Sequence, residues 1–326
     1  MDIHNTRSEL RPVIEEAVVT LWTMADDFKV QPGLYIDPDL PQWALIDSGR
    51  LRQVLLNVLS NAIKFSAFDL ISRCPEVYLH IEHIHGTHLQ VTLEDNGIGM
   101  PTSVTDNLFK PFMQGETSTT RRVDGTGLGL AITSNLLHLM NGDIVIKSAE
   151  GVGTTVAITW KLKTVEKTNT LTSLANQKVV WLTDDSFHRR ATFNFFAKSH
   201  AQFHWYKTDK DLKGVRLPAA KDTTVVMGSD NCDVSKGWRD ALRSQCKKLK
   251  FILFSLDRGA RLGLLEPDSY RIQTSPILIS QFHKALATPN VVTQFRSRPV
   301  AQQKRKRGAI RSKNAPCGLN RVGRRG

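Results

Sequence analysis

One stretch, residues 51–66, constrains the fold of this chain most strongly. It reads LRQVLLNVLSNAIKFS, and a broad apolar helical face is formed by Leu51, Val54, Leu55, Val58, Leu59 and Ala62. A helix with such a face must pack against a core, so the sequence predicts a core helix here. Asn57, Asn61 and Lys64 are spaced so that they share one flank of that helix.

The polar flank of this helix suggests binding of a metal-bound polyphosphate. The carbonyl oxygen of Asn61 suits a hard cation such as Mg²⁺, and Lys64, one turn on, can meet phosphate oxygens as a point charge. Asn on an exposed helical face is more often simply solvated. The segments that follow the helix therefore decide between the two interpretations.

The first of these segments is a glycine-rich turn at the end of a predicted strand. Asp95 is followed by Gly97 and Gly99, which allow a tight turn and close approach of a flat ligand. The Asp95 carboxylate can accept a hydrogen bond from an exocyclic amine such as that of adenine. The same pattern is also common in ordinary turns.

A second glycine-rich segment, GTGLGL at residues 125–130, opens a helix with an apolar period. Free N–H groups and the positive end of the helix dipole suit a phosphate at such a position. Residues 100–124 lack apolar periodicity and hold Pro, Gly, Ser and Thr, which is typical of a loop. Phe109 and Phe112 could dock that loop on the body.

Strands and helices are expected around these segments. We predict a helix with Ser8 as its N-cap at 8–24, two strands within 30–45, a hairpin at 77–84 and 88–93, and two further strands at 143–148 and 154–162.

Residues 8–163 resemble the catalytic ATP-binding domain of sensor histidine kinases, in the gyrase, chaperone and histidine kinase superfamily. Four blocks occur in the family's order, namely the N box (57–65), the first glycine box (95–99), the F box (109–112) and the second glycine box (125–130). Residues 151–154 also fit the family's closing hairpin. The ordered set covers nearly half of the chain.

The resemblance implies a site for ATP and Mg²⁺. Asn61 matches the Mg²⁺ ligand, with Asn57 beside it on the phosphates and Lys64 as the basic phosphate contact. Asp95 resembles the carboxylate that reads adenine. The other matches lie in the adenine pocket (Gly97, Gly99), the F box (Phe109), the lid near the γ-phosphate (Arg121 or Arg122), and the lid hinge and phosphate cradle (Gly125, Gly127, Gly129).

Asn57 discriminates within the superfamily. ATP-hydrolysing members place a glutamate one turn before the metal-binding Asn, where it activates water as a general base. An amide cannot take that proton. The resemblance therefore implies transfer of the γ-phosphoryl of Mg–ATP to a protein histidine and not hydrolysis. The alternative is a non-catalytic, nucleotide-binding scaffold that interacts with two-component partners.

In the second half, strand-like apolar runs alternate with helical segments, which suggests a flavodoxin-like α/β domain. The expected strands lie at 178–183, 202–206, 223–227, 251–254 and 277–279. It resembles a response-regulator receiver domain, in which Asp184 and Asp185 match the Mg²⁺-binding acidic pair and Ser255 the hydroxyl after the fourth strand. Asp230 comes one or two places late for a phosphoacceptor after the third strand. The family has a lysine after the fifth strand, and Ser280 stands at the position where we expect it. These departures imply a degenerate receiver, kept for packing or partner contact.

The expected fold class is α/β, a two-layer sandwich of the histidine kinase ATPase type followed by a doubly wound flavodoxin-like domain. We expect the catalytic domain at 8–163, a linker at 164–177, the receiver-like domain at 178–290 and a basic tail at 291–326. The formal net charge of the chain is +13 at pH 7. Residues 298–326 hold ten basic residues and no acidic one, so the net charge of the rest is about +3. Nucleic acid is therefore expected as a partner only through this tail.

Composition favours a reduced, cytoplasmic protein without a membrane span. No apolar run is long enough to cross a bilayer, and the four cysteines form no CxxC pair: Cys74, Cys232, Cys246 and Cys317. Only seven residues precede Ser8, so we expect the helical hairpin with the acceptor histidine to be missing. The expected partners are a histidine-containing dimerisation domain or partner kinase, and a response regulator.

Overall fold

The computed structural model describes residues 2–67, 74–110, 127–166, 177–182, 196, 198, 201–206, 217, 223–228, 232–245, 249–255, 261–273 and 277–288. Met1–Val291 form one compact unit. We call its described residues up to 166 the N-terminal lobe and those from 177 the C-terminal lobe. The α/β class is confirmed.

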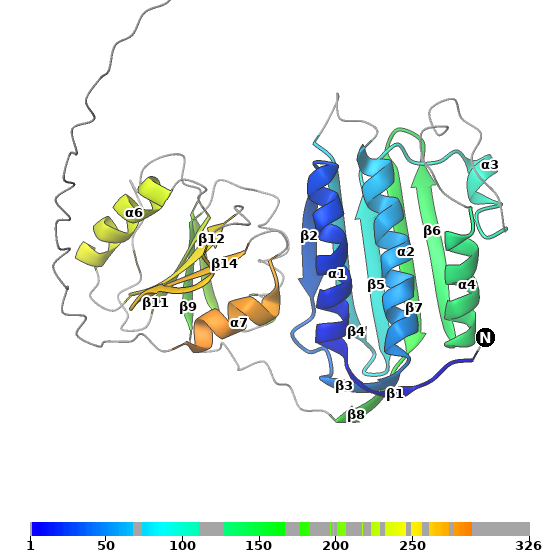
Figure 1. Ribbon diagram of the computed structural model, residues 1–326, viewed down its shortest axis with the longest axis horizontal. Helices are drawn as coiled ribbons and strands as arrows, with labels where there is room; N and C mark the ends of the chain where they lie inside the picture. The colour runs from blue at the N-terminus through cyan, green and yellow to red at the C-terminus, as the bar shows by residue number, and fades with distance from the viewer. Residues whose placement is uncertain are drawn as a thin grey trace, which may run out of the picture. The chain divides into compact units, whose positions relative to one another are not determined.

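The N-terminal lobe is built on a five-stranded sheet of order β2-β4-β5-β7-β6. β2 and β4 are parallel, and the other neighbours are antiparallel. The strands are β2 (Gln31–Ile36), β4 (Glu76–Ile84), β5 (His88–Asp95), β6 (Gly142–Ala149) and β7 (Gly153–Lys161). Figure 1 shows three helices on one face of this sheet, α1 (Leu10–Asp27), α2 (Ser48–Ser66) and α4 (Gly129–Leu139). A short helix, α3 (Thr102–Thr105), follows the glycine turn after β5.

The predicted core helix is α2. Asp47 precedes it, and its side chain accepts a hydrogen bond from the Arg50 N–H at 3.0 Å, which caps the first turn. All six residues of the predicted apolar face are buried in the core cluster that joins the three helices to the sheet. Burial of this face positions the polar flank of the helix for the site.

The start of α1 differs from the sequence prediction. Ser8 is not the N-cap: it lies in β1 (Thr6–Glu9), opposite Ala44 of β3 (Trp43–Ile46). Glu9 holds the N-cap position without a side-chain cap. The strand pairing, which also joins β8 (Lys163–Glu166) to β3, fixes the backbone of Ser8 in an extended conformation. A local capping rule cannot foresee this distant pairing.

The C-terminal lobe contains a six-stranded sheet of order β10-β9-β11-β12-β14-β13. The first five strands are parallel, and β13 is antiparallel to β14. The elements are β9 (Lys178–Leu182), β10 (Gln202–Tyr206), β11 (Thr223–Gly228), α6 (Cys232–Gln245), β12 (Leu249–Ser255), β13 (Gly263–Glu266), β14 (Ser269–Gln273) and α7 (Ile279–Ala287). Separate apolar clusters cover the two faces, because Trp181 joins one and Val180 the other.

The assignment of the position after the fifth strand was wrong. The fifth parallel strand is β14, so the position that follows it falls at 274–276, outside the described residues. Ser280 lies instead in the first turn of α7. The apolar run Ile277–Ile279 resembles a strand in sequence, but it leads into a helix that packs on the sheet.

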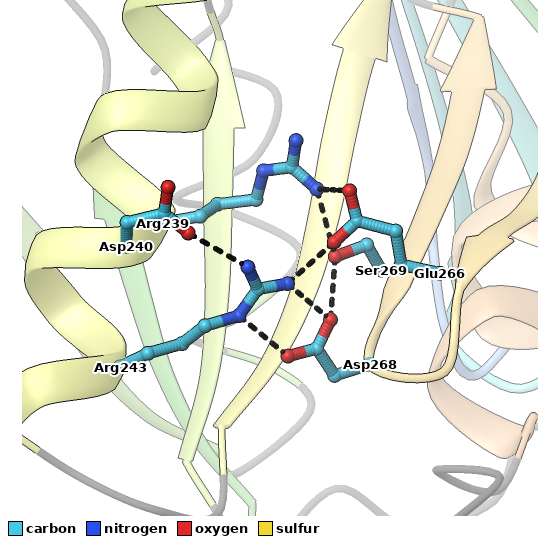
Figure 2. A network of polar contacts seen from close by, with 6 residues as sticks. All are labelled: Arg239, Asp240, Arg243, Glu266, Asp268 and Ser269. Carbon is cyan, nitrogen blue, oxygen red and sulfur yellow. Dashed lines mark hydrogen bonds and ion pairs between the residues drawn. The ribbon is translucent and has the colours of Figure 1, made fainter. Parts of the chain in front are cut away.

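A polar network ties α6 to the β13–β14 turn (Figure 2). Arg243 donates two hydrogen bonds to Asp268, at 2.9 and 2.7 Å, and one to Glu266 at 2.5 Å. The buried Arg239 bonds Ser269 at 3.1 Å and lies 2.9 Å from Glu266. These bidentate contacts hold the turn against the helix.

We expect Arg243→Met to lower the free energy of unfolding by about 1–3 kcal/mol. Methionine has a side chain of similar length but no guanidinium, so the half-buried Asp268 loses its bidentate partner. Chemical denaturation measures the change. Lys236→Met, at an exposed position of the same helix, is the control and should cost less than about 0.5 kcal/mol. Equal effects of the two variants would contradict a stabilising role for the network.

Candidate nucleotide-binding site

The polar flank of α2 meets the start of α4. The Asn57 amide donates to the Gly129 carbonyl at 3.4 Å and to the Thr133 hydroxyl at 3.2 Å. Asn61 and Lys64, also half-buried, continue this flank toward the C-terminal end of α2. The fold thus brings the Asn helix and the second glycine-rich segment together across more than seventy residues of sequence.

Asp95 lies at the end of β5, opposite Thr154 of β7. One carboxylate oxygen, Oδ1, accepts hydrogen bonds from the Gly97 N–H at 3.0 Å and from the Thr154 N–H at 3.2 Å. Two backbone donors from different segments therefore fix the orientation of this carboxylate. A fixed carboxylate at a glycine turn can accept a hydrogen bond from the exocyclic amine of a flat ligand.

The two glycines after Asp95 are required by close backbone contacts. A Cβ at Gly97 would lie 2.5 Å from the carbonyl oxygen of Phe65, at the end of α2. Gly99 has φ +64°, and a Cβ there would lie 1.9 Å from the carbonyl oxygen of Ala149. The turn is therefore clamped between α2 and the β6–β7 hairpin, where no larger residue fits.

Two contributors to this geometry were not among the site residues expected from the sequence. Gly153 has φ +134°, and a Cβ there would lie 2.1 Å from the carbonyl oxygen of Asp95. Thr133 is fully buried and links Asn57 to the Gly129 carbonyl, to which its own hydroxyl donates at 2.9 Å. A hydroxyl four residues after Gly129, within hydrogen-bonding distance of that carbonyl one turn back, was the available signal for Thr133.

The second glycine-rich segment is described in part. Gly127 has φ +65°, and Gly129 begins α4, where an added Cβ would meet nothing within 4 Å. The N-cap residue, Leu128, supplies no side-chain cap to the first turn of this helix. Such a turn presents N–H groups and the positive dipole end, which suit an anion.

The other predicted residues divide between the described chain and the rest. Phe109 follows α3 and is 39% exposed. Arg121, Arg122 and Gly125 lie outside the described residues, as do Phe112, Asp184, Asp185, Asp230 and the basic tail. Within the described part of the chain, no group of three or more His, Cys, Asp or Glu side chains could hold a metal ion. No helix there is long and apolar enough to span a membrane.

A family model matches most of the N-terminal lobe. Residues 46–164 match the family model described as histidine kinase-, DNA gyrase B- and HSP90-like ATPase. This segment includes α2, both sides of the glycine turn, and α4. The match supports an ATP-binding domain of the histidine kinase type in this part of the chain.

Curated relatives agree with that assignment. Hybrid signal transduction histidine kinase A of Dictyostelium discoideum is 40% identical over 146 residues, which are 42% of this chain and 7% of that protein. The autoinducer 2 sensor kinase/phosphatase LuxQ of Vibrio harveyi is 38% identical over 40% of this chain and 15% of its own length. Sensor histidine kinase RcsC of Escherichia coli K12 is 42% identical over 125 residues, which are 38% of this chain and 12% of that protein. The chain spans less than a sixth of each, and the matches support a kinase catalytic module.

One solved structure resembles both lobes. The crystal structure of full-length ShkA in complex with AMPPNP matches with a TM-score of 0.60 at 20% identity, over 89% of this chain and 58% of that one. At this identity the likeness shows the fold alone.

Proposed function

We propose that this chain carries the catalytic module of a two-component sensor histidine kinase, which transfers the γ-phosphoryl of Mg–ATP to a protein histidine on another segment or chain. The observation that carries the proposal is the contact of the Asn57 amide with Gly129 and Thr133. This contact supports the proposal because it brings the polar flank of α2 beside the N-terminus of α4, where one polyphosphate could contact both.

Adenine would bind at the glycine turn. Asp95 is held by the Gly97 and Thr154 N–H groups, so its carboxylate is preorganised to accept a hydrogen bond from the exocyclic amine. Gly97 and Gly99 let the turn pack closely against the end of α2 and the β6–β7 hairpin, which keeps Asp95 in place. The cost of orienting the carboxylate is met by folding, before the nucleotide arrives.

The phosphates would lie between α2 and the start of α4. Asn61 would hold Mg²⁺ through its amide oxygen, and Lys64 and the N–H groups at Gly127–Gly129 would contact phosphate oxygens. A single amide oxygen fits Mg²⁺, which commonly takes few protein ligands and completes its shell with phosphates and water. Bound Mg²⁺ would neutralise phosphate charge. Arg121 or Arg122 would contact the γ-phosphate, and Phe109 would help to dock the loop between the glycine boxes.

The residues of this site favour positioning over covalent chemistry. Asn57 stands where a hydrolysing relative would hold its general base, and its amide is bonded to α4. Catalysis would then rest on alignment and charge neutralisation of the γ-phosphoryl group for attack by an imidazole.

The C-terminal lobe is proposed to be a degenerate receiver of the flavodoxin-like kind, with domain boundaries at 8–163 and 178–290 and a linker between them. Its parallel strands follow the order 2-1-3-4-5, which supports this proposal. Between its fourth and fifth parallel strands lies the antiparallel strand β13. A histidine-containing dimerisation domain and a response regulator are the proposed partners.

Mg²⁺-dependent ATP binding by calorimetry tests the proposal. We expect the wild type to bind, and Asn61→Ala to weaken binding at least tenfold, because the metal loses its protein ligand. Gln53→Ala removes an amide about two turns earlier on the same helix and should leave the affinity unchanged. A folded wild type that does not bind ATP would refute the nucleotide site.

Transfer is tested separately by adding an isolated dimerisation hairpin that bears an acceptor histidine. Phosphohistidine on the hairpin is the expected product, and Asn61→Ala should abolish it. ATP binding without any transfer to such hairpins would instead favour a nucleotide-binding scaffold.

A further inference from the structure

Helix α7 of the C-terminal lobe is capped by a residue of the N-terminal lobe. Its own N-cap residue, Leu278, makes no side-chain cap. The Ser280 N–H donates instead to Glu15 of α1 at 3.2 Å, and the Ser280 hydroxyl donates to the other oxygen of the same carboxylate. Glu15 is only 7% exposed. A buried carboxylate at the N-terminus of a helix satisfies free donors and complements the helix dipole.

A second polar contact joins the lobes just after β2. The Lys198 ammonium lies 2.7 Å from Oδ2 of Asp37, whose side chain is 1% exposed. Asp37 also accepts from the Asp39 N–H at 3.0 Å, and its main-chain carbonyl accepts from Arg11 of α1. A carboxylate this deeply buried is costly without its cation, so the pair opposes separation of the lobes.

Aromatic packing lies beside these polar contacts. Tyr35 of β2 and Tyr78 of β4 are 1% and 3% exposed, and both belong to the apolar cluster that contains Phe196 and Phe282 of the C-terminal lobe. Although β2 is an edge strand, all of its residues except Gln31 are buried. The side of the sheet opposite α1 is therefore covered at β2 and β4 by the second lobe.

We propose that the face formed by β2, β4 and the Glu15 side of α1 is a docking surface whose occupant is the chain's own C-terminal lobe. The lobe is bound there as a fixed partner of the catalytic lobe, by contacts sufficient to hold it without the covalent linker. One side of the interface consists of Glu15, Asp37, Tyr35 and Tyr78. The other side consists of Ser280, Lys198 and Phe282.

The test separates the lobes covalently and asks whether they stay together. A protease site is inserted between residues 168 and 173 of the full chain, within the expected linker, and the cleaved protein is examined by size-exclusion chromatography. We expect the two fragments of the wild type to elute together at micromolar concentration. Elution as two separate folded fragments would overturn the proposal.

Variants on the C-terminal lobe identify the contacts. Lys198→Glu together with Ser280→Ala removes the cation and a donor and places two carboxylates face to face, so we expect the apparent dissociation constant of the cleaved fragments to rise at least tenfold. Lys284→Glu, an exposed charge reversal on α7, is the matched control and should not change it. Equal association of both variants, with unchanged circular dichroism, would refute the assigned interface. Calorimetric ATP binding by the same samples is read independently, so that loss of the nucleotide site and loss of docking are distinguished.

Discussion

Substituting Gly99 by alanine is expected to weaken ATP binding at least thirtyfold and to lower the free energy of unfolding by more than about 3 kcal/mol. The added methyl would lie 1.9 Å from the Ala149 carbonyl oxygen, and the backbone at φ +64° already disfavours alanine. Relief of this clash must move the glycine turn away from the β6–β7 hairpin. Asp95, which takes its orientation from both segments, would lose the Gly97 and Thr154 donors.

Gly86→Ala is the matched control for this experiment. Gly86 has nearly the same conformation, φ +66°, but an added Cβ meets nothing within 4 Å. It should cost only about 1–2 kcal/mol for the left-handed backbone and leave ATP affinity unchanged. Calorimetry and chemical denaturation of both variants separate the conformational cost from the steric one. Equal losses in the two variants would show that close backbone contact at Gly99 does not maintain the site.

The second large effect is a loss of stability in acid that depends on His283. Burial and the neighbouring Arg11 guanidinium lower the pKa of this α7 imidazole to about 4. A group whose folded-state pKa is depressed contributes stability that is present above the unfolded value, near 6.5, and is lost as the pH falls toward 4. With allowance for its partial exposure, we expect the folding equilibrium constant to fall about tenfold between pH 7 and pH 4.5 through this residue.

Comparison with His283→Gln isolates this contribution, since other groups titrate in the same range. Burial raises the pKa of Glu15 against the hydrogen bonds from Ser280, so its contribution has the opposite sign and is lost as the pH rises. Thermal unfolding from pH 7 to pH 4.5 should therefore show a shallower decline for His283→Gln than for the wild type. His138→Gln, at an exposed position of α4, should follow the wild type. Parallel curves for His283→Gln and the wild type would contradict the prediction.

Close residue patterns in the sequence were sufficient to predict most elements. The α2 face, the hairpin of β4 and β5, and strands β9, β10 and β11 follow from local periodicity, because side-chain direction repeats with the backbone. The failures lie where distant segments compete for the same residues. Ser8 pairs with β3 and does not cap α1. The apolar run 277–279 was predicted as a strand, but it leads into α7.

The candidate site shows the same division. Apolar periodicity placed Asn57 and Asn61 on a helix and Asp95 at a strand end, as the structure has them, because each position depends only on its own element. The sequence alone could not show that Asn57 donates to Thr133, or that Glu15 caps a helix 265 residues away. Local residues determine the elements and their polar faces because propensity and periodicity act over a few turns. Only the tertiary structure decides which buried donors and acceptors meet, because burial requires each to find a partner wherever the chain brings one.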